Sequence, residues 1–327
     1  MRVITLSALV ALFIAGCAAA PPLATLSQGT TGTISFQSLT FSGHLWDPFM
    51  PPLVEGKSAV GSGALTLPSG SGPFPAIILT HGCSGVTAGE TGWATTLTRA
   101  GIAAFVVDSF GDRNIREICT GRERINIASV LTDVYRALEL LGTHPRIDPS
   151  RIGIMGMSFG GRTAVWTSQT RFQERYGTGR HRFAAYLAFY PVSCYITLAD
   201  EVKVSGGPIR IFIGREDDWT PVGQCRQYVD RLRRMGTDVT LFEYPGAYHA
   251  FDNTTLPASR YWAEAISPRN CAFIERDGRI VDPATGKVAG IDAPCMTRGV
   301  HSGYNPDAYR KAVDDVRAFL RAAFKMP

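Results

Sequence analysis

Residues 151–161 read RIGIMGMSFGG, and this stretch decides the fold. Residues 151–155 form an apolar run typical of a buried strand, and the residues from 159 onward are compatible with a helix. The link between them, residues 156–160, has the pattern G-x-S-x-G, in which small residues flank a strained strand-to-helix turn. Such a turn lifts the hydroxyl of Ser158 above the sheet, beside a helix N-terminus that stabilises developing negative charge. The pattern predicts a nucleophilic Ser158; the alternative is a glycine-rich turn with an incidental serine.

Strand-like and helix-like segments alternate on both sides of this stretch. Continuous apolar runs at 76–80 and 102–108 are typical of parallel strands that are buried on both faces. The remaining predicted elements are strands at 33–41, 58–67, 183–190, 209–214 and 239–244, and helices at 125–141, 159–168, 222–235 and 306–324. This alternation predicts an α/β fold: a doubly wound, mostly parallel sheet with helices on both faces.

Residues 34–327 read as one domain, because no linker interrupts the alternation. Residues 252–303 depart from it, since they are polar, contain proline and glycine, and carry Cys271 and Cys295. We interpret this segment as an insertion held by its own disulfide. It either covers the site as a lid or decorates the surface.

Composition excludes several classes of protein. The 327 residues are 45% hydrophobic and only 19% charged, which excludes an intrinsically disordered chain. No apolar run is long enough for a polytopic membrane protein. The formal net charge is +5, but basic residues never form a block, so no nucleic-acid partner is predicted. The chain has neither a P-loop nor a dinucleotide fingerprint, and no zinc-ligand spacing.

The first residues predict export. A positive start and an apolar stretch at 3–15 have the length of a signal-peptide core, which is too short to span a bilayer. Residues 14–17, IAGC, look like a bacterial lipobox, in which residues 1–16 are removed and Cys17 is lipidated. Cleavage after residue 20 and an uncleaved anchor are the alternatives. We expect residues 17–33 to tether the domain to the membrane on the periplasmic side of a bacterial cell envelope, or the protein to be periplasmic.

Export changes the expected state of the other six cysteines. An even number of cysteines in an oxidising compartment indicates disulfides. The preferred arrangement pairs sequence neighbours, and buried free thiols are the alternative. The predicted pairs are Cys83 with Cys119, Cys194 with Cys225, and Cys271 with Cys295.

A serine nucleophile needs a base, and that base needs an orienting carboxylate. In this architecture the acid and then the histidine follow the serine in the chain. Only His249 and His301 come after a plausible acid-bearing strand. His249 is preferred because it directly follows the predicted strand 239–244, where a loop can direct it back to Ser158. His301 lies at the end of the insertion.

The carboxylate is expected in the loop 214–221, GREDDWTP, which follows another predicted strand. Asp217 and Asp218 both qualify by position, and Glu216 is a more distant candidate. One of the adjacent aspartates would bond the imidazole while the other caps the helix that begins near residue 221.

Two backbone donors are expected to bind the oxyanion. The first is the N–H of Phe159, the residue after the nucleophile. The second is expected in the loop 81–85, HGCSG, whose glycines let the backbone approach a ligand. We prefer the N–H of Cys83 for this role and interpret His81 as a packed structural histidine.

Side chains near these residues suggest how a substrate is held. Trp219 and Tyr248 are expected to lie near the pocket. The loop 109–124 carries Arg113, Arg116, Arg122 and Arg124. These arginines favour anionic substrates if they face the pocket, and otherwise form a solvated basic loop.

At this point the chain resembles the dienelactone hydrolase group of the α/β-hydrolase superfamily, over about residues 58–251 and the last helix. The motifs that carry the resemblance are PAIILTHGCSG (75–85), VVDSF (106–110), GMSFGG (156–161), GREDDWTP (214–221) and YPGAYHAFD (244–252). The resemblance implies an α/β-hydrolase fold with Asp217 as the acid, since the family acid is the third residue after the strand-end glycine and precedes a proline by four. It likewise implies His249 as the base.

The chain departs from the resembled family in two places. The founding enzymes have a cysteine nucleophile where this chain has Ser158, and an acidic residue in the oxyanion loop where this chain has His81 and Gly82. These differences favour an ordinary serine esterase, and the dienelactone substrate is not implied.

The motifs and the resemblance together predict a serine hydrolase that cleaves small carboxylic esters or lactones. Ser158, Asp217 and His249 would form the triad and an acyl-enzyme would be the intermediate. Neither a metal nor an organic cofactor is expected. The alternatives are a peptidase or amidase on the same triad, and a catalytically idle envelope lipoprotein that acts as a binding module. The oligomeric state is not predicted.

Overall fold

The computed structural model describes residues 21–42, 56–122 and 124–327. The predicted signal peptide, residues 1–16, and the predicted lipidation site at Cys17 lie outside these ranges. Within them, no helix has the length and apolar character needed to cross a membrane.

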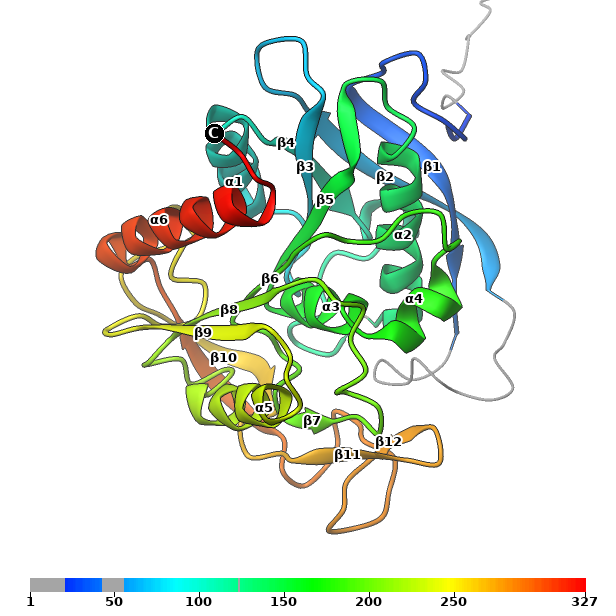
Figure 1. The fold of residues 1–327 in the computed structure, drawn as a ribbon. Helices are drawn as coiled ribbons and strands as arrows, with labels where there is room; N and C mark the ends of the chain where they lie inside the picture. The colour runs from blue at the N-terminus through cyan, green and yellow to red at the C-terminus, as the bar shows by residue number, and fades with distance from the viewer. Residues whose placement is uncertain (1–20, 43–55, 123) are drawn as a thin grey trace, which may run out of the picture.

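An eight-stranded sheet forms the centre of the molecule (Figure 1), in the order β1-β2-β4-β3-β5-β6-β8-β9. Strands β1 and β2 are antiparallel to their neighbours, whereas β4, β3, β5, β6, β8 and β9 run parallel. The predicted doubly wound, mostly parallel sheet is therefore confirmed. Its strands are β1 (Gly32–Thr40), β2 (Lys57–Thr66), β3 (Phe74–Thr80), β4 (Ala103–Asp108), β5 (Ile147–Met157), β6 (Tyr186–Phe189), β8 (Ile209–Gly214) and β9 (Val239–Tyr244).

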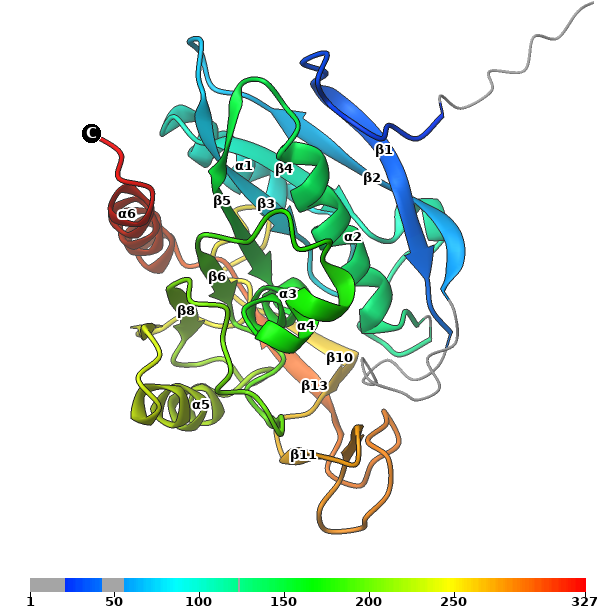
Figure 2. The same ribbon diagram turned by 45° about the vertical axis from the view of Figure 1, so that its right-hand side comes forward.

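Helices cover both faces of this sheet. Helices α1 (Ala88–Arg99) and α6 (Pro306–Ala323) lie on one face. The other face carries α2 (Ile127–Leu141), α3 (Phe159–Thr167) and α4 (Thr170–Tyr176), as Figure 2 shows. Helix α5 (Val222–Arg234) packs against β9, and the short 3-10 helix η1 (Gly111–Arg113) follows β4.

Helix α1 is not predicted from the sequence, because its threonines have low helix propensity. A capping box sets its start instead: the Thr87 side chain accepts a hydrogen bond from the Gly89 N–H, and the Glu90 carboxylate accepts one from the Thr87 N–H. Trp93 then anchors the helix in the core, where it is fully buried.

The insertion at 252–303 is more regular than expected. Strands β10 (Arg260–Ser267) and β13 (Thr297–Ser302) form an antiparallel pair. Strands β11 (Phe273–Arg276) and β12 (Arg279–Val281) join β7 (Ile196–Thr197) of the main domain in a three-stranded sheet. The insertion is thus attached to the domain by backbone pairing.

The structured domain begins before the predicted boundary at residue 34. The Leu23 N–H donates to the Ser35 carbonyl at 2.7 Å. Leu26 is fully buried, and its N–H donates to the Thr143 hydroxyl at 2.8 Å. The predicted tether, residues 17–33, is therefore too long, because these two leucines bury apolar surface against the domain.

The predicted pairing of the six cysteines is confirmed. Cys83–Cys119 joins the loops that follow β3 and η1, Cys194–Cys225 joins the segment after β6 to α5, and Cys271–Cys295 closes a loop within the insertion. Each disulfide closes a loop of tens of residues, which stabilises the folded state by about 3–4 kcal/mol.

Candidate active site

Ser158 stands at a sharp turn between β5 and α3, as its motif predicts. Its backbone has φ 56° and ψ −110°, a conformation that L residues rarely adopt. The turn needs glycine on both sides, since a Cβ at Gly156 would lie 2.0 Å from the Gly160 carbonyl oxygen. A Cβ at Gly160 would lie 2.1 Å from the Thr80 carbonyl oxygen. This close packing holds the serine in its strained position above the sheet.

The three residues proposed as a triad are in hydrogen-bond contact. The distance from His249 Nε2 to Ser158 Oγ is 2.9 Å, and that from His249 Nδ1 to Asp217 Oδ2 is 2.8 Å. All three side chains are buried. A carboxylate can only accept, so Nδ1–H donates to Asp217 and Nε2 is left to accept the serine proton. The geometry is that of a nucleophile, a base and an orienting acid.

Asp217 and Asp218 have different partners. The Asp217 carboxylate accepts hydrogen bonds from the Trp219 and Thr220 backbone N–H groups and from the Thr220 hydroxyl, at 2.8–2.9 Å. Asp218 does not cap α5, contrary to expectation; it accepts from the backbone N–H and Nδ1 of His301 at 2.7 and 2.8 Å. The other candidate histidine is therefore bound to the other candidate acid.

Two aromatic rings enclose the imidazole of His249. The ring centroids of Tyr190 and Trp219 lie 4.4 and 4.8 Å from it. Tyr190 is in turn held by Asp252, whose carboxylate accepts from the Tyr190 hydroxyl and from Trp93 Nε1, both at 2.6 Å. Burial raises the pKa of the Asp252 carboxyl and also that of the Tyr190 hydroxyl.

Sequence reasoning missed Tyr190. It directly follows β6, and the carboxyl ends of parallel strands meet at the same edge of the sheet. This rule identified the loops of Asp217 and His249, and applied to β6 it would also have identified Tyr190.

The two expected oxyanion donors lie beside Ser158. Among the described residues no acceptor takes the backbone N–H of Phe159 or of Cys83. Gly82 packs against Ser158, where a Cβ would lie 3.5 Å from the serine Cβ. The Cys83 carbonyl accepts from the Ile118 N–H, and the disulfide to Cys119 ties the same residue to the next loop. His81 is buried and its Nε2 accepts from the Ser109 N–H, as expected of a structural histidine.

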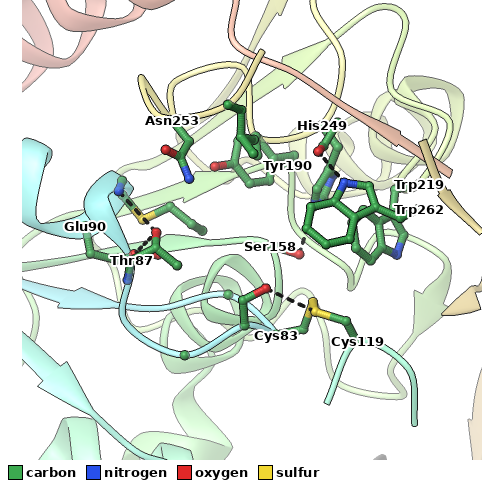
Figure 3. A pocket seen from close by; sticks show the side chains of 18 of the residues that line it. Cys83, Thr87, Glu90, Cys119, Ser158, Tyr190, Trp219, His249, Asn253 and Trp262 are labelled. Atoms are coloured by element: carbon green, nitrogen blue, oxygen red, sulfur yellow. Dashed lines mark hydrogen bonds between the residues drawn. A yellow bond between two sulfur atoms is a disulfide. The ribbon is translucent and has the colours of Figure 1, made fainter. Parts of the chain in front are cut away.

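Two cavities adjoin Ser158. The larger, about 270 Å³, is shown in Figure 3: Trp219 and Trp262 lie on the side of His249, whereas Glu90 and Asn253 lie across the cavity. The smaller is about 50 Å³. Its lining includes Phe159, Ile118, Arg162, Val192, Ile266 and Met296.

Two expectations about the pocket are only partly met. Trp219 lines both cavities, but Tyr248 is absent from the described residues that line them, and its ring lies 5.7 Å from that of His301. The four arginines of the loop 109–124 are absent from the two linings as well. Arg113 instead forms a buried ion pair with Asp133, at 2.8 Å.

The insertion forms part of both cavities, so it is more than a surface decoration. Trp262 and Ser302 line the larger cavity, and the Trp262 indole donates to the Ser302 hydroxyl at 2.7 Å. Ile266 and Met296 line the smaller cavity.

Comparison with known families and structures agrees with this fold. The model of the dienelactone hydrolase family matches residues 62–276. A Bradyrhizobium protein whose name describes it as a 2-oxo-3-(5-oxofuran-2-ylidene)propanoate lactonase is 25% identical over 201 residues, which cover 57% of this chain and 77% of that protein.

Solved structures share the fold at low sequence identity. A Klebsiella pneumoniae protein named as a dienelactone hydrolase has a TM-score of 0.51 and 16% identity, over 88% of this chain and 98% of that one. An α/β-hydrolase from a Medee basin deep-sea metagenome library also has a TM-score of 0.51, with 15% identity over 90% of this chain and all of that one.

Proposed function

Because this chain belongs to the dienelactone hydrolase family, we propose that it is a serine hydrolase that cleaves carboxylic esters or lactones through an acyl-enzyme. The observation that carries the proposal is the continuous hydrogen-bonded chain from Ser158 Oγ through the imidazole of His249 to the buried carboxylate of Asp217. Esterase activity is favoured over peptidase activity by the lactonase name of the similar Bradyrhizobium protein.

In the acylation step, Ser158 Oγ attacks the ester carbonyl as His249 Nε2 takes the serine proton. Asp217 holds the imidazole in the required tautomer and stabilises the imidazolium that forms. The N–H groups of Phe159 and Cys83 bind the oxyanion, and each such donor lowers the barrier by about 3 kcal/mol. The tetrahedral intermediate then collapses: the bond between the carbonyl carbon and the alcohol oxygen breaks, and His249 gives the proton to the departing oxygen.

In the deacylation step, water repeats this attack on the acyl-enzyme. His249 Nε2 takes a proton from the water, a second tetrahedral intermediate forms at the same carbonyl carbon, and Ser158 Oγ leaves as its proton is restored. The strained backbone of Ser158 keeps Oγ in place for both steps.

The test is covalent labelling with an organophosphonate serine probe, followed by intact-protein mass measurement. We expect a single adduct on the wild type and none on Ser158→Ala. The same pair is assayed on an aryl acetate, where Ser158→Ala should lose at least about a thousandfold in kcat. Labelling of neither protein, with ester hydrolysis unaffected by Ser158→Ala, would contradict the proposal and favour the idle-fold alternative.

We also propose that the protein is exported and anchored by a lipid on Cys17, in the bacterial cell envelope. Three disulfides support an oxidising compartment. Fractionation tests this: the wild type should be recovered with membranes and Cys17→Ser in the soluble fraction. Equal distribution of the two would contradict a lipid anchor.

A further inference from the structure

The two cavities beside Ser158 differ in size, and only the larger is lined by His249. Both are lined by Ser158, Trp219, Cys83 and Cys119, so they meet at the reacting serine. A carbonyl carbon attacked there must direct its acyl substituent and its alcohol oxygen away from each other. Each cavity can therefore receive one side of an ester.

The position of His249 determines which cavity receives the alcohol and which receives the acyl substituent. His249 lines the larger cavity and is absent from the described residues that line the smaller one. The departing alcohol oxygen must receive its proton from His249 Nε2, so it has to lie within hydrogen-bond reach of that atom. The alcohol therefore belongs to the larger cavity, and the acyl substituent to the smaller cavity beside Phe159.

The volumes limit the two groups. A cavity of about 150 Å³ binds one benzene ring, which is about 25 Å³ for each non-hydrogen atom. On this scale the smaller cavity of about 50 Å³ holds about two non-hydrogen atoms and the larger cavity of about 270 Å³ holds about eleven. A short acyl chain fits the first. A group as large as a two-ring aromatic fits the second.

The lining of the larger cavity suits an apolar alcohol. Trp219, Trp262, Tyr190 and Leu256 give it aromatic and aliphatic walls. Among the described residues that line it, the only acidic or basic side chains are His249 and Glu90. Glu90 is buried and its carboxyl group accepts hydrogen bonds from Thr87, across the cavity from His249. No lysine or arginine is among the described residues that line this cavity, so an anionic alcohol would find no counter-charge there.

We propose that the preferred substrates are esters of short-chain acids with bulky, apolar, non-anionic alcohols. The smaller cavity binds the acyl group and the larger cavity binds the alcohol. This inference rests on the proposed ester hydrolysis at Ser158 and deepens it by assigning a direction to the bound ester.

The direct test uses two isomeric esters that differ only in the direction of the ester bond. Naphthylmethyl acetate has a bulky alcohol and a short acid, and methyl naphthylacetate has the reverse; both leaving groups are alkoxides of similar basicity. We expect kcat/KM to be at least about tenfold higher for naphthylmethyl acetate. Equal values, or a preference for methyl naphthylacetate, would overturn the inference while leaving the proposed function intact.

The acyl length provides a second measurement. Among naphthylmethyl acetate, butanoate and octanoate, kcat/KM should fall with acyl length, by at least about tenfold between acetate and octanoate, because the octanoate chain far exceeds the smaller cavity. Met296→Ala enlarges that cavity and should restore part of the octanoate rate relative to acetate. Leu256→Ala, the matched control, truncates a wall of the larger cavity only and should leave this ratio unchanged.

The outcomes separate the two proposals. Octanoate hydrolysed as fast as acetate by the wild type would overturn the assignment of the acyl group to the smaller cavity. Hydrolysis of none of these esters, together with no labelling of Ser158 by the phosphonate probe, would overturn the proposed function itself and the inference with it.

Discussion

At the scale of single residues, the adjacent carboxyls of Asp217 and Asp218 bond to different histidines. Asp217 Oδ2 lies 2.8 Å from His249 Nδ1, and Asp218 Oδ2 lies 2.8 Å from His301 Nδ1. The sequence alone does not show which of the two acids bonds the proposed catalytic histidine, because hydrophobic periodicity does not tell which of two adjacent loop residues faces a given site. Three hydrogen bonds from Trp219 and Thr220 fix the direction of the Asp217 carboxylate.

Asp217→Asn should therefore lower kcat by about 10⁴-fold, because the amide no longer fixes the tautomer of His249. The fold should persist, since the amide oxygen still accepts from the Trp219 and Thr220 N–H groups. Asp218→Asn is the matched control and should lower kcat by less than about tenfold. Steady-state kinetics on an aryl acetate checks both, and an equal loss in the two variants would contradict the assignment of Asp217.

Asp252 gives a prediction about pH. Burial raises the pKa of its carboxyl above the ordinary value of 3.8. The folded state then keeps this proton at pH values at which the unfolded chain has lost it. Stability from Asp252 is therefore greatest at low pH and declines as the pH rises from about 4 toward the folded pKa, by at most about 1.4 kcal/mol per pH unit.

Asp252→Asn cannot ionise, so the wild-type free energy of unfolding minus that of the variant should decrease as the pH rises. Urea unfolding of both proteins between pH 4 and 7 measures this difference, which cancels the contributions of other groups. A difference that stays flat or grows with pH would contradict the raised pKa.

At the scale of secondary-structure elements, buried parallel strands are the best predicted parts of the chain. β8 and β9 begin and end at the expected residues, because each is a compact apolar run beside loops rich in polar residues, glycine or proline. Strands β10 to β13 are not predicted. Their residues are more polar, and their order comes from pairing with β7 and with each other across the chain.

Three elements are joined by one buried ion pair. Arg113 of η1 forms a bidentate pair with Asp133 of α2, at 2.8 and 2.9 Å, and donates to Thr40 Oγ1 and the Leu39 carbonyl of β1. The sequence leaves open whether Arg113 faces the pocket or forms part of a solvated loop. Neither holds in the structure, because its guanidinium is buried against Asp133 and has a structural role.

Either Arg113→Ala or Asp133→Ala should reduce the free energy of unfolding by about 3–5 kcal/mol, because each leaves a buried charge without its counter-ion. The double variant should lose less than the sum of the two, by about 0.5–3 kcal/mol. Urea unfolding of the four proteins measures this coupling, and strict additivity would contradict it. The kcat/KM of the folded variants should equal that of the wild type.

At the scale of the whole molecule, one of the three disulfides lies at the candidate active site and the other two lie away from it. Cys83–Cys119 lines both cavities, while neither residue of Cys194–Cys225 does. The two bridges close loops of similar length, with sequence separations of 36 and 31 residues. Loop closure should therefore contribute about 3–4 kcal/mol in each case.

The double variants Cys83→Ser/Cys119→Ser and Cys194→Ser/Cys225→Ser should thus show similar losses of thermal stability. Only the first should also lose kcat, by about tenfold or more, because it releases the loop that carries the proposed oxyanion donor. Calorimetry and steady-state kinetics at a temperature where both are folded separate these effects. An equal kcat in the two variants would contradict a role for Cys83 in binding the oxyanion.

The insertion touches both of the loops that carry the proposed acid and the proposed base. His301 binds Asp218, the neighbour of the proposed acid, and Ser302 forms a β-bridge with His249. In evolutionary terms, we expect these contacts to make the segment evolve together with the two loops rather than independently of them. Positions 218 and 301 should covary among homologues, and lineages that lost β10 and β13 should have released position 218 from selection for an acid.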